Sequence, residues 1–492
     1  MSYMKSNNGD NISGFSSLTK SAAGPFWLFT LSAIVILIIS QLIQDGMFMD
    51  GMIYVSVGKN LANGIGTFWD PHFSDIAMAS YHEQPPLYFG LLAVFFKVFG
   101  FSMYVERLFC LLCFILVTVY IYKLWVKLFP VKEGVNNTAW LPVLFWAITP
   151  CIFWAYINHV EETLMTVFVV ASVYYIYRAL FLKEKPILYM IVSGGLIFLA
   201  SLTKGAQGMF PLAAVGLYWF VFRSISFKKA VGYTLVLISV PVTIYACLLG
   251  FSSSAYLSFE KYYRDRYVPT FSNIMNTTNH RFALMGELFM QLLPIIALSA
   301  VVLLFTRRYI KKENENKANY RAITWFLLIG LSGSLPLLVT LEQRGFYLVT
   351  VIPFFALAIA LWVAPAISTL FDRINIKSIG FNVFKIFSMV LFVASIIFAF
   401  SQVGNTKRDG EVLSDVYKIN KVIKEGDVIS MPPQMHDEWG TRAYFIRYGS
   451  INLDPLRNHK YYLIDTEIPS TVPQGYKKLS LGLTRLELYE SE

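Results

Sequence analysis

Apolar residues gather in long runs along most of the chain, separated by short polar segments. Twelve runs stand out, and most approach the ~20 residues that a helix needs to cross the ~30 Å core of a bilayer. Backbone in lipid must satisfy its own hydrogen bonds, so the spans are expected to be helical. The runs cover residues 26–44, 86–100, 104–126, 138–157, 160–181, 187–203, 206–222, 229–250, 286–306, 321–341, 345–369 and 379–402. This pattern predicts an all-α polytopic membrane protein.

Three longer segments interrupt the pattern, at residues 45–85, 251–285 and 403–492. In the last, DVISM, KYYLIDT and RLELY have the composition of short strands, and EVLSDVYKINKVIKEG has the periodicity of an amphipathic helix. We therefore expect a transmembrane domain over 1–402, with loops 45–85 and 251–285 carrying the chemistry. A small soluble α/β domain over 403–492 is expected to follow, without a catalytic motif but as a candidate for acceptor selection.

Composition supports the membrane assignment. The chain is 56% hydrophobic and 15% charged, whereas soluble domains are about 45–50% apolar and about 25% charged. The first run lacks a cleavage-site pattern and is too long for a signal-peptide core, so it is expected to be a retained anchor. All four cysteines fall inside apolar segments without zinc or disulfide spacing, which favours buried thiols that act as small hydrophobic side chains.

The net charge of +10 bears on orientation rather than on nucleic acid. Lys and Arg lie in short loops between apolar runs, where orientation signals belong. The run RRYIKKENENKANYR at 307–321 and the turns at 224–229 and 372–377 are predicted to be cytoplasmic. That places 251–285 and the tail outside, as well as 45–85 if the N-terminus is cytoplasmic. Since twelve spans would leave the tail inside, about 12–13 helices are expected, with a thirteenth crossing between Pro85 and Arg223.

The segment after the first run carries two carboxylates, Asp45 and Asp50, in QDGMFMDGMIY. Asp45 is interpreted as the polar end of a membrane helix. A short amphipathic helix after Asp50 is expected to lie in the interface plane. Glu83 stands directly before the Pro-Pro pair that opens the next run, a pair that suits the first turn of a helix. Glu83 and Asp50 are thus expected to face each other near the membrane surface, where ionisable groups usually face a cavity.

The order of these features resembles a known family. Asp50 and Tyr54 are followed by NLANGIGTFW, EQPPLYFGLLAVFFKVFG and ERL, and later by SLTKGAQGMFP at 201–211, NHRF at 279–282 and FYLVTVIPFFAL at 346–357. This pattern, over most of residues 26–360, resembles the GT-C membrane glycosyltransferases that use polyprenyl-phosphate-linked sugars. They include the protein O-mannosyltransferases and the lipid A aminoarabinose transferases.

The resemblance implies sugar transfer, with inversion, from a polyprenyl-phosphate donor to a protein, lipid A-like glycolipid or glycan. It also implies a bacterial inner (plasma) membrane protein, with the active site and C-terminal domain facing the periplasm or outside. Membrane lipids are expected partners and nucleic acid is not. The sequence does not identify the sugar or the acceptor.

The resemblance also implies roles for individual residues. Asp50 is the expected catalytic residue, as general base on the acceptor hydroxyl or as the carboxylate that orients it. Glu83 and His280 are the expected ligands of a divalent metal ion (Zn, Mg or Mn) beside the lipid phosphate. Gln84 stands where the family often has Lys, which removes one phosphate contact. The remaining expected substrate or lipid-phosphate contacts are Tyr54, Gln84, Arg281, Arg264, Arg344, Tyr347 and Lys204, with Arg266 as a further candidate.

Lys204 lies at the edge of two apolar segments, and a buried unpaired charge is very costly. We expect it to pair with Glu161 or Glu162, and the sequence does not distinguish the two. The alternative functions are a lipid or sugar transporter or flippase, and a ligase of similar fold that joins polysaccharides to lipids. Transporters tend to show inverted repeats and midplane charges, but the sequence has no evident internal repeat. Such a ligase relies on arginines rather than on an Asp after the first span.

Overall fold

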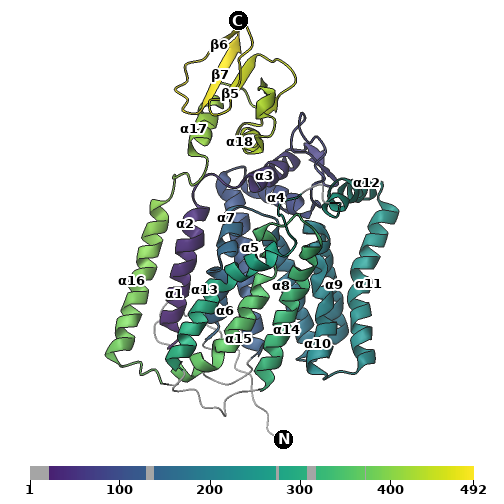
Figure 1. Cartoon of the computed structure of the whole chain (residues 1–492), viewed down its shortest axis with the longest axis vertical. Helices are drawn as coiled ribbons and strands as arrows, with labels where there is room; N and C mark the ends of the chain where they lie inside the picture. The colour runs from purple at the N-terminus through teal and green to yellow at the C-terminus, as the bar shows by residue number, and fades with distance from the viewer. Residues whose placement is uncertain (1–21, 129–137, 273–275, 307–316, 372) are drawn as a thin grey trace.

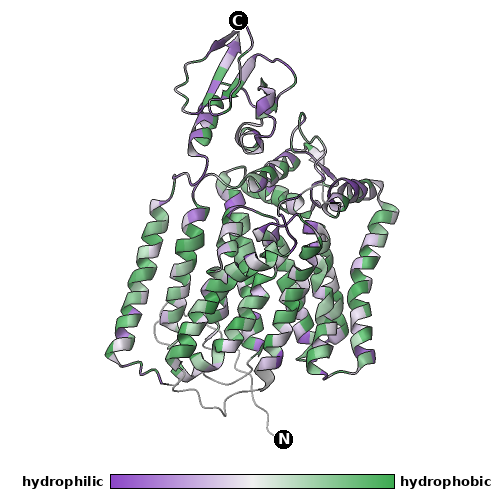
Figure 2. Cartoon of the chain, in the orientation of Figure 1, coloured by the Kyte–Doolittle hydropathy of each residue, from purple (hydrophilic) through white to green (hydrophobic). Residues whose placement is uncertain are grey.

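The apolar runs form helices that stand side by side as a bundle, with a small domain projecting from one face (Figure 1). The computed structural model describes residues 22–128, 138–272, 276–306, 317–371 and 373–492. Helices of the bundle are mostly green in the hydropathy colouring, whereas the projecting domain mixes purple, white and green (Figure 2). We call the face that carries this domain the domain-bearing face. Most of the predicted basic run at 307–321 lies outside the described residues.

The helices of the bundle and its surface are bounded as follows: α1 Gly24–Ile34, η1 Val35–Ile39, α2 Ser40–Leu42, α3 Met49–Ala62, α4 Leu87–Phe99, α5 Met103–Leu128, α6 Trp140–Ala147, α7 Pro150–Ile157, α8 Glu162–Leu180, α9 Pro186–Lys204, η3 Gly205–Ala213, α10 Ala214–Phe222, α11 Phe227–Phe251, α12 Ser253–Lys261, η4 Tyr262–Tyr267, η5 Val268–Thr270, α13 Ala283–Thr306, α14 Lys317–Ser334, η7 Leu335–Val339, η8 Gly345–Leu348, α15 Ile352–Phe371 and α16 Ile379–Ser401. Within the described residues, nine helices are long and apolar enough to span a membrane, or ten if α6 and α7, bent by 70°, form one span. The predicted all-α polytopic architecture is confirmed, although this number is below the expected 12–13.

The number of spans is lower than expected partly because the run at 86–100 does not cross the bilayer. It forms α4, which lies beside α3 at the domain-bearing face (Figure 1). Tyr88 near the start of α4 packs against Tyr54 of α3 at 6.1 Å, and Phe96 near its end lies under Arg447 of the projecting domain at 5.0 Å. Both ends of α4 are therefore at the same face. The predicted thirteenth crossing between Pro85 and Arg223 is not present among the described residues.

The runs at 187–203 and 206–222 form two passes through the bundle, as expected, although they join in one apolar stretch, Pro186–Phe222. Lys204, at the end of α9, contacts Glu162 at the start of α8, whereas Tyr218 of α10 donates to the Leu180 carbonyl at the far end of α8. The chain reverses at Gly205, whose φ of +66° favours glycine and whose Cβ would lie 2.3 Å from the Tyr262 hydroxyl. If α6–α7 counts as one span and Pro186–Phe222 as two, the ten spans of the described residues become eleven. This odd number agrees with the charge pattern.

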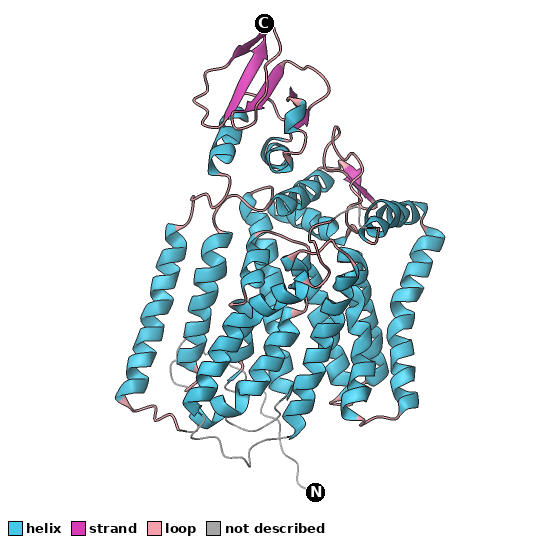
Figure 3. Ribbon diagram, viewed as in Figure 1, coloured by secondary structure: helices cyan, strands magenta, loops and turns pink. Residues whose placement is uncertain are grey.

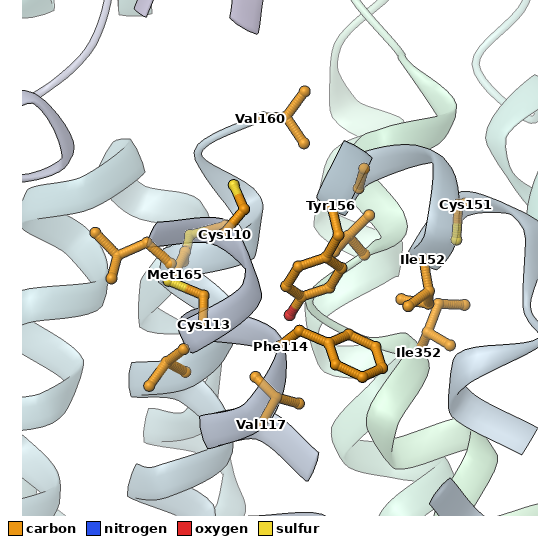
Figure 4. Packing of buried hydrophobic residues seen from close by; sticks show 14 of the residues in the cluster. Cys110, Cys113, Phe114, Val117, Cys151, Ile152, Tyr156, Val160, Met165 and Ile352 are labelled. Carbon is orange, nitrogen blue, oxygen red and sulfur yellow. The ribbon is translucent and has the colours of Figure 1, made fainter. Parts of the chain in front are cut away.

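Aromatic and aliphatic side chains fill the bundle interior, and Figure 4 shows part of this packing. Cys110, Cys113 and Cys151 are buried among these side chains, as expected, but Cys247 of α11 is exposed. Phe114 stacks on Trp146 at 4.5 Å and meets Tyr156 edge-on at 5.2 Å, joining α5 to α6 and α7. The bent α6–α7 pair is thus fixed by the same core.

The C-terminal residues form a five-stranded mixed sheet with helices beside it, and a two-stranded hairpin lies in the first loop (Figure 3). The sheet order is β4-β3-β5-β7-β6, in which β3 is parallel to β4 and β5, and β7 is antiparallel to β5 and β6. Three strands lie where the sequence predicts them (β3, β5 and β7). The bounds are β1 Gly66–Thr67, β2 Asp70–Pro71, α17 Gly410–Ile419, β3 Val428–Ser430, η9 Pro433–Met435, α18 Trp439–Gly449, β4 Asn452–Asp454, β5 Tyr461–Asp465, β6 Tyr476–Lys478 and β7 Leu486–Ser491.

Buried polar contacts hold this domain on α3. Arg447 of α18 donates through Nε to Glu106 of α5 at 2.9 Å, and both side chains are buried. Lys59 of α3 donates to the Arg447 carbonyl at 3.0 Å and to Ser450 Oγ at 2.8 Å. Asp45 accepts hydrogen bonds from Tyr448 and Tyr417. Asp45 is therefore an anchor for the C-terminal domain as well as the end of a membrane helix.

Candidate functional site

Asp50 lies in the first turn of α3, where a carboxylate suits the positive end of the helix dipole. The turn is held in place from the α7–α8 connection, because Asn158 Oδ1 accepts from the Phe48 amide at 2.8 Å. Gly51 permits the close approach, since a Cβ there would lie 1.9 Å from the Asn158 carbonyl oxygen. This local fit brings Asp50 close to the start of α8 and the end of α9.

Asp50 faces a cavity of about 310 Å³ at the domain-bearing face, which we call the central cavity. Segments far apart in sequence build it, from α3, the first loop, the end of α9, η4 and the chain around η8. Six of the predicted site residues line it, namely Asp50, Tyr54, Gln84, Lys204, Arg344 and Tyr347. Its other lining residues are Arg266, Asn276, Thr277, Glu342 and Phe346.

The central cavity carries three cations, Lys204, Arg266 and Arg344, beside two carboxylates, Asp50 and Glu342. Burial raises the pKa of the Asp50 carboxyl above its ordinary value, and the three cations oppose part of that rise. A carboxylate with a raised pKa is a better proton acceptor. The cavity therefore places a basic carboxylate next to positive charge that suits a phosphate.

Lys204 pairs with Glu162, and this resolves the choice that the sequence left open. Lys204 Nζ lies 2.7 Å from Glu162 Oε1, with the Glu162 side chain fully buried. Glu161 is also buried, and within the described part of the chain its carboxylate oxygens accept no hydrogen bond. The Lys204 ammonium also lies over the Tyr347 ring at 5.1 Å. Lys204 thus contacts both Glu162 in the bundle interior and Tyr347 at the cavity wall.

The expected metal ligands do not come together. Arg266 contacts the Glu83 carboxylate at 3.3 Å and pairs with Glu342 as well, so the Glu83 oxygens already face a cation. His280 is exposed and does not line the cavity. Among the residues that the structure describes, no group of three or more His, Cys, Asp or Glu side chains is arranged to hold a metal. The residues present therefore do not fit a divalent ion, and we derive no step through one.

Two predicted phosphate contacts lie away from the cavity. Arg264 is exposed and pairs with Glu260 and Asp265 on its own helical segment. Arg281 is also exposed, and its carbonyl accepts from Gln343. Arg266, which lies two residues after Arg264, lines the central cavity where Arg264 and Arg281 were expected.

A larger and more apolar cavity of about 410 Å³ adjoins the central one, between η3, η4, η5 and η7. It shares Lys204, Arg266 and Tyr347 with the central cavity, and Met209, Phe210 and Leu337 contribute to its apolar wall. The two cavities together thus offer a charged end and an apolar end.

Glu342, Asn276, Thr277 and Phe346 were not identified from the sequence. Glu342 had a usable signal, because LEQRG places two charges between apolar runs, and ionisable residues there tend to face cavities. Asn276, Thr277 and Phe346 carry no such signal, because polar residues are common in loops and phenylalanine is common near the membrane interface.

Residues 83–248 match the family described as dolichyl-phosphate-mannose-protein mannosyltransferase, which covers about a third of the chain. A sequence comparison with curated proteins gives no match.

Two solved structures share the fold. ArnT from Cupriavidus metallidurans bound to undecaprenyl phosphate is similar with a TM-score of 0.59 and 11% identity, over 94% of this chain and 97% of that chain. The Archaeoglobus fulgidus oligosaccharyltransferase in its apo form has a TM-score of 0.54 and 12% identity, over 93% of this chain and 70% of that one. The predicted resemblance to GT-C glycosyltransferases is confirmed by the family model together with the fold.

Proposed function

We propose that the chain is a membrane glycosyltransferase that moves a sugar from a polyprenyl-phosphate donor to an acceptor hydroxyl in the central cavity. The observation that carries this proposal is the position of Asp50, between a cationic wall and open cavity space, with an apolar cavity continuing behind the cations. ArnT, which shares the fold, is described with undecaprenyl phosphate bound. We place the domain-bearing face at the periplasm or outside of a bacterial inner membrane, in agreement with the charge pattern.

The donor lies with its polyprenyl chain in the apolar cavity and its phosphate at Lys204 and Arg344. Lys204 has its counterion Glu162 behind it, whereas Arg344 is exposed and has no ion-pair partner among the described residues. Arginine binds phosphate through its planar fork of donors. Arg344 is therefore the main phosphate contact, and Lys204 adds a second positive charge at the same cavity.

The reaction is a direct displacement at the anomeric carbon. Asp50 takes the proton of the acceptor hydroxyl as its oxygen forms the bond to that carbon. The bond from the anomeric carbon to the phosphate oxygen breaks, and polyprenyl phosphate leaves with one additional negative charge. The cavity cations stabilise this developing charge. Attack from the face opposite the leaving phosphate inverts the anomeric configuration.

Mass spectrometry of glycolipids, envelope glycans and glycoproteins tests this function in cells. A deletion strain is expected to lose one glycosylated product, which the wild-type gene restores and the Asp50→Asn gene does not at equal protein abundance. Restoration by Asp50→Asn would contradict the proposal. Unchanged products, with donor lipid shifted between leaflets, would indicate a flippase instead.

A further inference from the structure

Asp50 faces a second space on the side of the C-terminal domain. This cavity has a volume of about 200 Å³, and we call it the aromatic cavity because Tyr81, Tyr54 and Trp439 contribute to its wall. It shares Asp50, Tyr54, Gln84 and Arg266 with the central cavity and extends from them toward Trp439. Asp50 thus stands between a space suited to the donor phosphate and a smaller space that the proposed mechanism has not yet used.

Trp439 is supplied by the C-terminal domain, as the first residue of α18. Its ring lies 6.4 Å from the Phe73 ring of the first loop, and the Arg442 guanidinium lies 5.2 Å from its centroid. The side chain is half-buried. Contacts with Phe73 and Arg442 therefore hold the ring at the cavity wall, while part of it stays accessible.

The position of Trp439 depends on how α18 is docked. Ser56 of α3 donates to the Ala443 carbonyl at 3.2 Å, Lys59 donates to the Arg447 carbonyl, and Arg447 pairs with Glu106. Undocking would leave these buried charged groups without partners, at considerable cost. The domain is thus fixed on the same helix that carries Asp50, and Trp439 forms part of the site in the docked chain.

The charge of the aromatic cavity differs from that of the central cavity. Glu83 and Asp50 are its acidic groups, and Arg266, which already pairs with Glu83, is the one cation among its described lining residues. A phosphate placed here would face two carboxylates and one cation, whereas the central cavity has three cations beside its two carboxylates. A neutral molecule with hydroxyl groups would instead find carboxylate acceptors, the Gln84 amide and aromatic surface.

These properties match a single pyranose ring. A sugar has an apolar C–H face that packs on an aromatic ring, and a rim of hydroxyls that hydrogen-bonds to carboxylates and amides. A cavity of about 200 Å³ has room for a single sugar ring but little for an extended peptide.

We propose that the aromatic cavity binds the acceptor as a neutral sugar residue of a glycan, with Trp439 as its stacking surface, so that the C-terminal domain takes part in acceptor selection. This inference rests on the proposed transferase function. The acceptor hydroxyl then meets Asp50 from the aromatic side while the donor phosphate lies on the cationic side. That arrangement places nucleophile and leaving group on opposite sides of the reacting carbon.

Steady-state kinetics of the full chain in liposomes test the inference. The donors are polyprenyl phosphates that carry single hexoses or pentoses, and the acceptors are alkyl hexopyranosides, Ser/Thr peptides and a phosphorylated glycolipid. Wild type is expected to use alkyl hexopyranosides. Trp439→Ala should raise the acceptor KM about tenfold and leave the donor KM unchanged, with Trp439→Phe in between. Tyr476→Ala, which removes a ring on edge strand β6, is the matched control and should change neither constant.

The outcomes separate this inference from the proposed function. An unchanged acceptor KM in a folded Trp439→Ala variant would overturn it, as would a wild type that uses peptides or phosphorylated acceptors alone. If Trp439→Ala does not fold, as judged by its melting temperature, the KM of Trp439→Phe decides the question in the same way. A wild type that turns over none of the donor and acceptor pairs would contradict the transferase function itself.

Discussion

Replacing Lys204 by Met tests the ion pair on which the cavity wall is built. Lys204 Nζ and Glu162 Oε1 are 2.7 Å apart, with side-chain exposures of 8% and 0%. Met keeps most of the apolar stem but removes the ammonium, so Glu162 becomes a buried carboxylate without its counterion. Breaking a buried pair in this way costs about 3–5 kcal/mol. The same change removes a cation from the central cavity.

Thermal unfolding of purified variants, followed in one detergent, measures the stability effect. Lys204→Met should melt well below wild type, and Lys204→Met/Glu162→Gln should recover most of the loss because no charge is left unpaired. Lys204→Met/Glu161→Gln is the matched control and should recover less, since Glu162 stays ionisable. Activity should remain low in all three variants, because each lacks the Lys204 charge at the donor phosphate.

Two results would refute this reasoning. A Lys204→Met variant that melts at the wild-type temperature would mean that the pair does not stabilise the fold. Better recovery with Lys204→Met/Glu161→Gln than with Lys204→Met/Glu162→Gln would mean that Lys204 pairs with Glu161 rather than with Glu162.

Three further predictions concern the donor site, the domain interface and proton transfer. Arg344→Gln should raise the donor KM at least tenfold, because it loses a charge-assisted hydrogen bond worth about 1.5–3 kcal/mol. Arg281→Gln should leave the donor KM unchanged, and equal effects of the two substitutions would contradict the placement of the phosphate at Arg344. Arg447→Met should leave Glu106 buried and unpaired, lowering the melting temperature and exposing the C-terminal domain to limited proteolysis; wild-type resistance would argue against the interface. Because burial raises the pKa of Asp50 and its ionised form is the active one, kcat/KM should fall as pH decreases through a value above the ordinary Asp pKa of about 4; a rate independent of pH down to 4 would contradict this role.

The architecture could be predicted from the sequence because long apolar runs mark spans. Asp45 and Asp50 both lie at the edge of the first run, and only the resemblance carried by Tyr54 and EQPPLY favoured Asp50 as the catalytic candidate. The run at 86–100 was wrongly predicted to be a span, since an apolar stretch of this length fits a surface helix as well as a short span. Only its contacts with α3 and Arg447 show that it stays at one face.

The rest of the site depends on contacts between distant segments, which periodicity does not report. Asp45 was interpreted as a helix end because its partners, Tyr417 and Tyr448, lie hundreds of positions away. Arg266 and Arg264 are two residues apart, and the sequence could not tell which one faces the cavity. Trp439 belongs to a tail without a recognisable motif, and only docking of α18 on α3 brings it to Asp50.

We propose that Asp50 activates an acceptor hydroxyl for attack on a lipid-phosphate sugar. The most direct test is transfer by purified wild-type and Asp50→Asn proteins in liposomes, with the same polyprenyl-phosphate donor and acceptor. We expect Asp50→Asn to lower kcat by a factor of about 10² or more. Its donor KM should stay near wild type and its melting temperature should be no lower, because the replaced carboxyl is partly desolvated. An Asp50→Asn protein with wild-type turnover would contradict the claim.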